Sequence, residues 1–151
     1  MPQTPPQDQP ATPSAPEVLI TTYGVLHGQP PSAQRPQALI EIDLRTALRN
    51  PHEDPGMRFL TGLDQAVYEH VRATAGAEQI MRDALGDILR ELDRADALFD
   101  HGNALVEVHV FCQGGRHRSV SMGRWLQAEL LPMGISVQLV HRDIDKDVVQ
   151  P

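Results

Sequence analysis

The sequence has little cysteine, few aromatic residues and no long apolar segment. It holds one cysteine among 151 residues, which excludes an internal disulfide and a cysteine-rich zinc site and fits a reducing compartment. Aromatic residues make up 4% of the chain, so we expect a mainly aliphatic core. No apolar run approaches the roughly 20 residues that cross a bilayer. The N-terminus also lacks the basic and apolar regions of a signal peptide, and we therefore expect a cytoplasmic protein without a membrane partner.

Basic residues are in the minority. The chain has 13 Lys and Arg against 20 Asp and Glu, which gives a formal net charge of −7. General binders of nucleic acids or anionic membranes usually carry an excess of Lys and Arg. The balance therefore argues against both classes. The length fits one ordinary domain, and hydrophobic residues at 40% suffice for its core.

The composition divides the chain into a tail and a body. Residues 1–16 are rich in Pro and Gln and contain no large apolar residue except Met1, so we expect them to be disordered. A Pro-rich ligand for another protein is the alternative role of this leader. We place one domain at residues 17–146 and a short second tail at residues 147–151.

Hydrophobic patterns in the body predict alternating strands and helices. β-branched runs indicate strands, and apolar residues at helical spacing indicate helices. The last strand, loop, helix and strand form a βαβ unit, which requires parallel strands. The predicted fold is a single α/β domain with a mainly parallel sheet flanked by helices. Strands are expected at residues 18–23, 38–43, 105–112 and 137–140, and helices at residues 63–74, 77–99 and 120–131.

Polar and charged residues follow each predicted strand. Ligands of parallel sheets bind beyond the carboxyl ends of the strands, so these residues form the candidate site. If all strands run the same way, their side chains meet at one edge. In chain order they are His27, then Asp43, Arg45 and His52, then residues 114–119, and finally His141 and Arg142.

Residues 114–119, which we call the glycine loop, combine flexibility with positive charge. Its glycines let backbone N–H groups approach a ligand closely, and the helix that follows offers unpaired N–H groups and the positive end of its dipole. Ser119 supplies a hydroxyl, either as a helix cap or as a ligand donor. The loop favours an anion site, above all for phosphate, over a Ser-capped helix with solvated arginines. It reads Gly114, Gly115, Arg116, His117, Arg118 and Ser119.

Cys112 stands directly before the glycine loop and leaves two interpretations open. With Arg118 it matches the cysteine-x5-arginine loop of tyrosine and dual-specificity phosphatases, in which a thiolate attacks phosphorus and the arginine binds the phosphate. Phe111 stands where those enzymes carry a histidine, and the partner acid, Asp43 or Asp54, is not identified. The other interpretation, which we favour, is a small buried residue at a strand end.

Several motifs across residues 17–145 occur in a characteristic order. They are Tyr23-Gly24-x-x-His27-Gly28, Asp43-x-Arg45, Asn50-Pro51-His52-x-Asp54-Pro55, Arg58, Thr61-Gly62-Leu63-Asp64, Cys112-x-Gly114-Gly115-x-His117-Arg118-Ser119 and His141-Arg142. In this order they resemble the C-terminal domain of the RapZ family, the RNase adaptor proteins also called UPF nucleotide-binding proteins.

The resemblance implies a fold similar to a phosphofructokinase subdomain and a pocket for an amino-sugar phosphate, glucosamine-6-phosphate. For full-length members it also implies RNA binding and self-association, which makes a homo-oligomer one candidate assembly. Carried over by motif, the pocket would use His27, Asp43, Arg45, His52, Gly114, Gly115, His117, Arg118 and Ser119.

The chain departs from full-length family members in two respects. It has no G-x-x-x-x-G-K-[ST] motif, so we expect no ATP or GTP binding by that route, and a separate P-loop protein becomes a candidate partner. Family members end in a Lys and Arg cluster that contacts RNA. Residues 142–147 read Arg-Asp-Ile-Asp-Lys-Asp instead, a pattern that would repel RNA phosphates.

The leading hypothesis is a non-catalytic domain that binds a phosphorylated small molecule, with sugar phosphates as the first class, and that uses no cofactor. In this hypothesis Arg118, His117 and the loop amides hold the phosphate, and Asp43, His27 and His52 bond to hydroxyl or amino groups. A cysteine phosphatase and an RNA-binding adaptor remain as alternatives. A metal site is not expected, because no short ligand spacing supports one.

Overall fold

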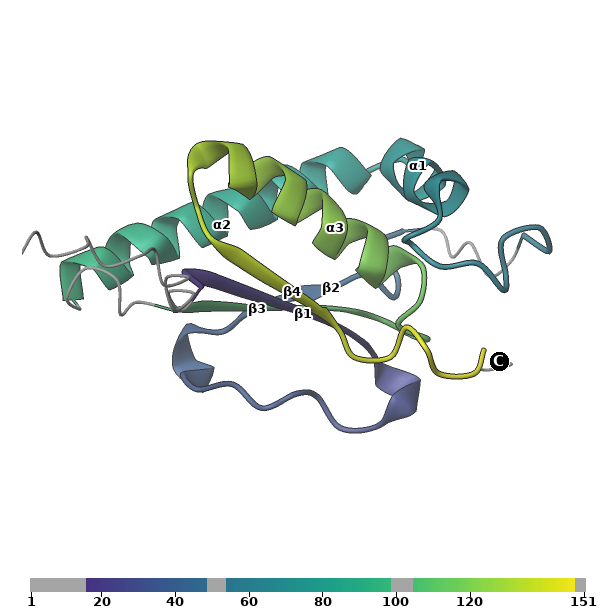
Figure 1. The fold of residues 1–151 in the computed structure, drawn as a ribbon, viewed down its shortest axis with the longest axis horizontal. Coiled ribbons are helices and arrows are strands. Elements are labelled where there is room, and N and C mark those ends of the chain that lie inside the picture. Colours follow the sequence, from purple (N-terminus) through teal and green to yellow (C-terminus); the bar gives the residue numbers. More distant parts are fainter. Residues whose placement is uncertain (1–15, 49–53, 99–104, 149–151) are drawn as a thin grey trace, which may run out of the picture.

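The computed structural model describes residues 16–48, 54–98 and 105–148. Strands and helices alternate along these ranges, and the strands form one all-parallel sheet, which confirms the α/β class (Figure 1). Short 3₁₀ helices are marked η. The elements are β1 (Val18–Gly24), η1 (Val25–His27), η2 (Pro36–Ala38), β2 (Ile40–Asp43), α1 (Gln65–Ala73), α2 (Ala77–Leu98), β3 (Val106–Cys112), α3 (Arg118–Leu130), η4 (Leu131–Met133) and β4 (Val137–His141).

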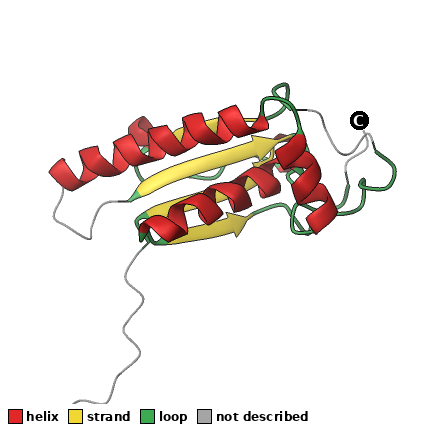
Figure 2. Ribbon diagram, turned by 90° about the horizontal axis from the view of Figure 1, so that it is seen from above, coloured by secondary structure: helices red, strands yellow, loops and turns green. Residues whose placement is uncertain are grey.

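The strand order β2-β3-β1-β4 decides which connection lies on which face of the sheet. The steps from β2 to β3 and from β3 to β4 run in one direction along the sheet, and the step from β1 to β2 runs in the other. Because crossovers between parallel strands are right-handed, the two directions require opposite faces. The α-helices accordingly cover one face, while residues 25–39 cross the other (Figure 1). Figure 2, which is viewed from the helical side, shows the helices in front of the sheet and the strands pointing the same way.

The hydrophobic core lies between the sheet and the helices and is mainly aliphatic, as the low aromatic content predicts. Every residue of β3 is buried, because this inner strand is covered on both faces. On α2, Met81, Ala84 and Ile88 are spaced by three and four positions, so they face the sheet together, and all three are buried. Burying a side chain such as Ile88 contributes about 2 kcal/mol.

Residues 25–39 cover the second face without a regular α-helix, because their prolines interrupt helical hydrogen bonding. The carboxylate of Glu107, on β3, accepts the backbone N–H groups of Gln34 at 2.7 Å and Arg35 at 3.1 Å. Glu107 is 6% exposed, and these bonds satisfy its buried oxygen. The connection is thereby fixed across the sheet.

Most boundaries agree with the sequence prediction to within one residue, and three differ by two residues, one of them the start of α1 at Gln65 instead of residue 63. α3 begins at Arg118 instead of residue 120, and β2 begins at Ile40 instead of residue 38, since Pro36–Ala38 form a 3₁₀ turn. Residues 1–15 and 149–151 lie outside the described ranges, so the two tails and the domain limits stay predictions. In the described part of the chain, no helix combines the length and apolarity needed to cross a membrane.

Candidate functional site

The register of the parallel strands brings the loops after them to one edge of the sheet. Gly24 of β1 pairs with Cys112 of β3, and Asp43 of β2 pairs with Phe111, so these strands end level. β4 lies along the other side of β1 and points the same way. The predicted site residue His52 lies outside the described residues.

The glycines at this edge allow two backbone segments to cross in contact. A Cβ on Gly115 would lie 2.5 Å from the Gly24 nitrogen, and a Cβ on Gly24 would lie 2.4 Å from the Gly114 carbonyl carbon. Gly115 also has φ +74°, a left-handed conformation that favours glycine. Gly114 differs, because a Cβ there would meet no atom within 4 Å. Gly115 thus permits the close contact between the two segments, whereas Gly114 faces open space.

The glycine loop folds around the sulfur of Cys112. The N–H of Gly115 donates to Sγ at 3.3 Å, and Sγ donates to the Ser119 hydroxyl oxygen at 3.2 Å. Cys112 is 3% exposed, so the buried strand-end interpretation is confirmed for its location. The residue at the N-cap of α3 is His117, and its side chain makes no cap hydrogen bond. Ser119 therefore bonds to the thiol and does not cap the helix.

Arg118 is directed inward, although the sequence hypothesis assigns it to phosphate. It is 2% exposed, and Nη1 donates to the carbonyl oxygens of Leu44 and Arg45 at 2.9 Å and of Leu48 at 3.1 Å. The guanidinium thereby ties the segment after β2 to the first turn of α3. Its role toward a ligand stays a prediction.

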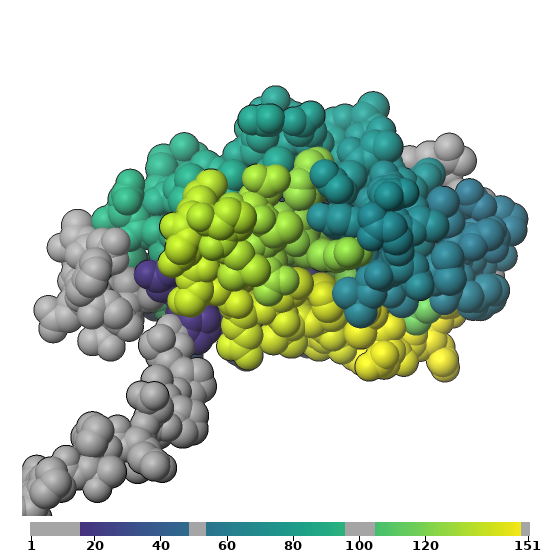
Figure 3. All heavy atoms as spheres, turned by 45° about the horizontal axis from the view of Figure 1, so that its top comes forward, coloured from purple at the N-terminus to yellow at the C-terminus, as the bar shows by residue number. Residues whose placement is uncertain are grey.

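Arg116 and His117 of the glycine loop also hold neighbouring segments. Arg116 donates to the carbonyl oxygens of Ile144 at 3.0 Å and Phe59 at 2.9 Å. His117 is 6% exposed, and its Nε2 lies 3.0 Å from the carbonyl oxygen of Met57. These contacts join the loop to residues 54–64 and to the C-terminal segment, residues 142–146. Figure 3 shows the two segments, blue and yellow, side by side on this part of the surface.

Asp43 and Arg45 form an ion pair that faces solvent at the same edge. Arg45 Nε lies 2.9 Å from Oδ1, Nη2 lies 2.7 Å from Oδ2, and both side chains are more than 40% exposed. Hydrogen bonding from Arg45 lowers the pKa of the Asp43 carboxyl. The Arg45 guanidinium also lies over the Phe111 ring, 5.5 Å from its centroid. The pair thus presents an ionised acceptor beside a cation.

The histidines of the edge have different surroundings. His27, in η1, is half-buried, and within the described residues its Nε2 is a buried atom with no hydrogen-bond partner. His141 turns toward the helical face, where Nδ1 lies 2.7 Å from the Thr22 hydroxyl, and burial lowers its pKa. Of these two, His27 is the one with a buried ring nitrogen that has no hydrogen-bond partner in the described residues.

Asp143 is a buried residue of the edge that sequence reasoning missed. Its side chain has no exposed surface, and Oδ2 accepts the N–H of Gly24 at 2.8 Å and Nη2 of Arg142 at 2.8 Å, while Lys146 Nζ lies 2.6 Å from Oδ1. Burial opposes ionisation, but these hydrogen bonds outweigh it and lower the pKa of Asp143 to about 2. Only its place two residues after the end of the last strand could have marked it, since one acid among several gives no signal.

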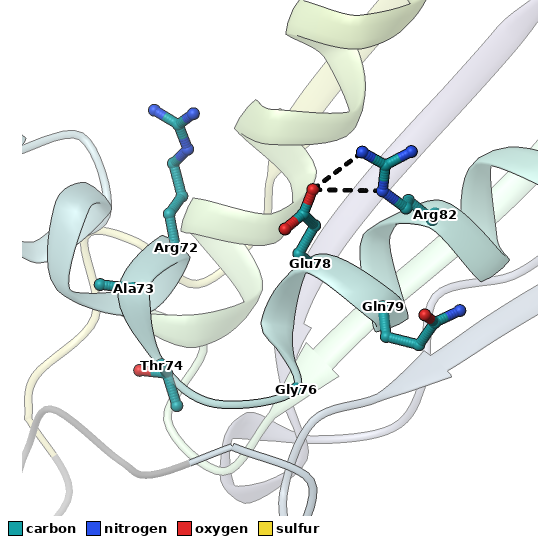
Figure 4. Close-up of a pocket in the computed structure, with 7 residues that line it drawn as sticks. All are labelled: Arg72, Ala73, Thr74, Gly76, Glu78, Gln79 and Arg82. Carbon is teal, nitrogen blue, oxygen red and sulfur yellow. Dashed lines mark hydrogen bonds and ion pairs between the residues drawn. The ribbon is translucent and has the colours of Figure 1, made fainter.

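A cavity of about 450 Å³ lies elsewhere, at the corner between α1 and α2 (Figure 4). Its charges are partly neutralised, because Arg82 donates to Glu78 at 2.8 Å. Arg72 lies over the rings of Tyr68 and Trp125. The residues that line it include none of the predicted site residues, so the sheet edge remains the candidate site. They are Arg72, Ala73, Thr74, Gly76, Glu78, Gln79 and Arg82.

No group of three or more His, Cys, Asp or Glu among the described residues is arranged to hold a metal ion.

Comparison with known proteins gives the chain a family. A model of the RapZ C-terminal domain matches residues 16–145. The chain is 34% identical over 128 residues to a nucleotide-binding protein of Thermobifida fusca, 35% over 132 to one of Erythrobacter litoralis and 37% over 130 to one of Thermus thermophilus. These alignments cover 85%, 87% and 85% of this chain but 40%, 41% and 43% of the relatives, so it spans less than half of their length. The chain belongs to the RapZ C-terminal domain family.

Proposed function

We propose that this domain binds a phosphorylated small molecule at the carboxyl edge of its sheet and performs no chemistry on it. The ligand class is a sugar phosphate, with glucosamine-6-phosphate as the first compound to test. The observation that supports this most directly is the glycine loop. It leads into the first turn of α3, a helix of 13 residues without a side-chain cap, and its Gly114 borders open space. Uncapped N–H groups at a helix N-terminus attract phosphate.

The charge around the loop supports an anion even though its cations have protein partners. Arg116 donates to the carbonyl oxygens of Ile144, Lys146, Phe59 and Leu60. Carbonyl groups satisfy the hydrogen bonds of a guanidinium but do not neutralise its formal charge. Because opposite charges attract more strongly where water is partly excluded, this charge favours a phosphate bound to the loop amides.

The remaining polar groups of the edge suit the sugar. Asp43 is ionised at neutral pH and exposed, so it can accept a hydrogen bond from a hydroxyl or an ammonium group. His27 Nε2 is buried without a partner in the described residues, and a ligand hydroxyl would satisfy it. In this proposal Arg45 contacts a second oxygen of the phosphate or the ring. A ligand with both a phosphate and an amino group would use all three.

Isothermal calorimetry with four compounds tests the proposal. The expected order of affinity is glucosamine-6-phosphate, then glucose-6-phosphate, then inorganic phosphate, with free glucosamine weakest, because the phosphate makes the charge-assisted bonds. Arg45→Gln should weaken binding about 10-fold, the usual effect of losing a bond to a charged group. Arg82→Gln, also an exposed ion-paired arginine but at the helix corner, is the matched control. No heat of binding from any phosphorylated compound contradicts the proposal.

A second candidate is a cysteine phosphatase, because the loop presents a backbone N–H and a hydroxyl to Cys112 Sγ. In that reaction the sulfur would attack phosphorus and release an alcohol, and water would then cleave the sulfur–phosphorus bond. Against it, the thiol is 3% exposed and Nη1 of Arg118 is bonded to carbonyl groups. Phosphate release from aryl and sugar phosphates should be the same in the native protein and in Cys112→Ser. A rate that depends on Cys112 would replace the binding proposal with this one.

A further inference from the structure

Asp143 lies at the point where the end of β1 crosses the glycine loop. It belongs to the C-terminal segment, and its fully buried carboxylate accepts the N–H of Gly24. Arg142 and Lys146, on the same segment, contact this carboxylate at 2.8 Å and 2.6 Å. The two cations compensate the buried charge, and the bond to Gly24 connects it to β1.

The backbone of Gly115 packs closely against both Gly24 and Asp143. An atom added to Gly115 would come within 3.0 Å of the Asp143 Cβ and within 2.5 Å of the Gly24 nitrogen. The hydrogen bond from Gly24 to Asp143 therefore holds β1 against Gly115. The N–H of Gly115 in turn donates to Cys112, so the loop conformation depends on this contact.

The C-terminal segment holds the glycine loop at a second point. Arg116 donates to the carbonyl oxygens of Ile144 and Lys146 at 3.0 Å and 3.1 Å, and also to that of Phe59. The position of the Arg116 side chain therefore depends on the backbone of Ile144 and Lys146, residues that follow Asp143 closely in the chain. The segment fixes the loop through the crossing and through this guanidinium.

Electrostatics alone would disfavour a carboxylate behind an anion site, because its negative charge repels the anion. Asp143 cannot touch a ligand, since it has no exposed surface. We infer that Asp143 is a positioning residue of the proposed phosphate site, which fixes Gly24 against Gly115 and so presets the glycine loop for an anion. This inference rests on the proposed function.

Two substitutions separate positioning from charge. Asp143→Ala removes the acceptor for the Gly24 N–H, and we expect it to weaken glucosamine-6-phosphate binding about 10-fold. Asp143→Asn keeps an acceptor oxygen and removes the charge, so it should restore affinity to within about 3-fold of the native value. Asp145→Ala, which removes an exposed acid two residues away, is the matched control and should bind at least as well as the native protein.

The outcomes differ for the other roles that Asp143 could have. An electrostatic role predicts that both substitutions strengthen anion binding, because both remove a negative charge. A purely structural role predicts a lower Tm with unchanged affinity at temperatures where the variants are folded. Either result overturns the inference.

Amide hydrogen exchange keeps this test separate from that of the proposed function. In Asp143→Ala the N–H groups of Gly24 and Gly115 should exchange about 10-fold faster, while that of Val108, in the core of β3, stays unchanged. Unaltered exchange at both glycines overturns the positioning role, whatever the protein binds. Faster exchange in a protein that binds no phosphorylated compound refutes the proposed function and with it the phosphate site that Asp143 would position.

Discussion

Arg118, the first residue of α3, donates from Nη1 to the carbonyl oxygen of Leu44 across 2.9 Å, although the two residues are 74 positions apart in the chain. The same nitrogen reaches the carbonyl oxygens of Arg45 and Leu48. The segment that carries the exposed Asp43 and Arg45 pair is therefore held against the glycine loop by one buried cation. Burying a charge costs free energy unless the charge is hydrogen-bonded. The Arg118 guanidinium therefore depends on these carbonyl groups, and the segment that carries them depends on Arg118.

Replacing Arg118 with glutamine should lower the free energy of unfolding by about 3 kcal/mol, because a buried, multiply bonded charge is exchanged for a shorter neutral group. Urea denaturation measures this loss. Arg94→Gln removes an exposed ion pair on α2 and should change the same quantity by less than about 0.5 kcal/mol. Equal small losses in the two variants would mean that the bonds of Arg118 do not stabilise the fold.

Gly114 and Gly115 are neighbours in the loop but should respond in opposite ways to substitution. Gly115→Ala should cost about 3 kcal/mol of unfolding free energy, because φ is +74° and the added carbon would meet the Gly24 nitrogen. Gly114→Val should leave stability nearly unchanged, since its side chain enters open space, and should block the proposed phosphate site. Thermal unfolding and calorimetry on both variants check this, and normal binding by folded Gly114→Val would contradict the position of the site.

The stability should depend on pH in two separate windows. Burial lowers the pKa of His109 and His141. Near pH 6.5 the two imidazoles therefore bind protons in the unfolded chain but stay neutral in the folded one. The free energy of unfolding therefore falls as the pH drops below about 6.5. The pKa values of Asp43 and Asp143 are also lowered, the latter to about 2, and their contribution is lost only below about pH 4.

Urea denaturation over a pH series separates these windows. His141→Asn should reduce the loss in the histidine window and leave the acid one intact, whereas Asp143→Asn should do the reverse. A constant free energy of unfolding between about pH 7 and pH 5 would mean that neither histidine is kept neutral by folding.

The fold could be predicted from the sequence because its signals are local. The β-branched run at Val18 and the helical spacing of Met81, Ala84 and Ile88 depend on residues close together in the chain. The level strand ends followed from the parallel arrangement. These regularities placed the candidate residues at one edge before any side-chain contact was known.

The contacts of the site could not be predicted in the same way, because they join distant segments. No residue close to Arg118 in the sequence indicates that its partner is the backbone carbonyl group of Leu44. A cation in a glycine-rich loop therefore suggested an exposed side chain that binds phosphate. Asp143 followed a strand as one acid among several, and its importance depends on meeting Gly24, 119 residues earlier. Local patterns therefore located the site but gave no information on which residues hold its segments together.

Asp43 should decide between amino sugars and neutral sugars. Its carboxylate is ionised and exposed, and an ammonium group on the ligand would add a charge-assisted bond that a hydroxyl cannot match. Asp43→Asn should therefore weaken glucosamine-6-phosphate about 10-fold and glucose-6-phosphate by less than about 3-fold. Calorimetry with both compounds on the native protein and the variant gives the two ratios. Glu41→Gln, which neutralises an exposed acid of the same strand two positions earlier, is the control and should change neither. Equal weakening of both ligands by Asp43→Asn would mean that the carboxylate holds the Arg45 side chain in place and does not distinguish an amino group from a hydroxyl.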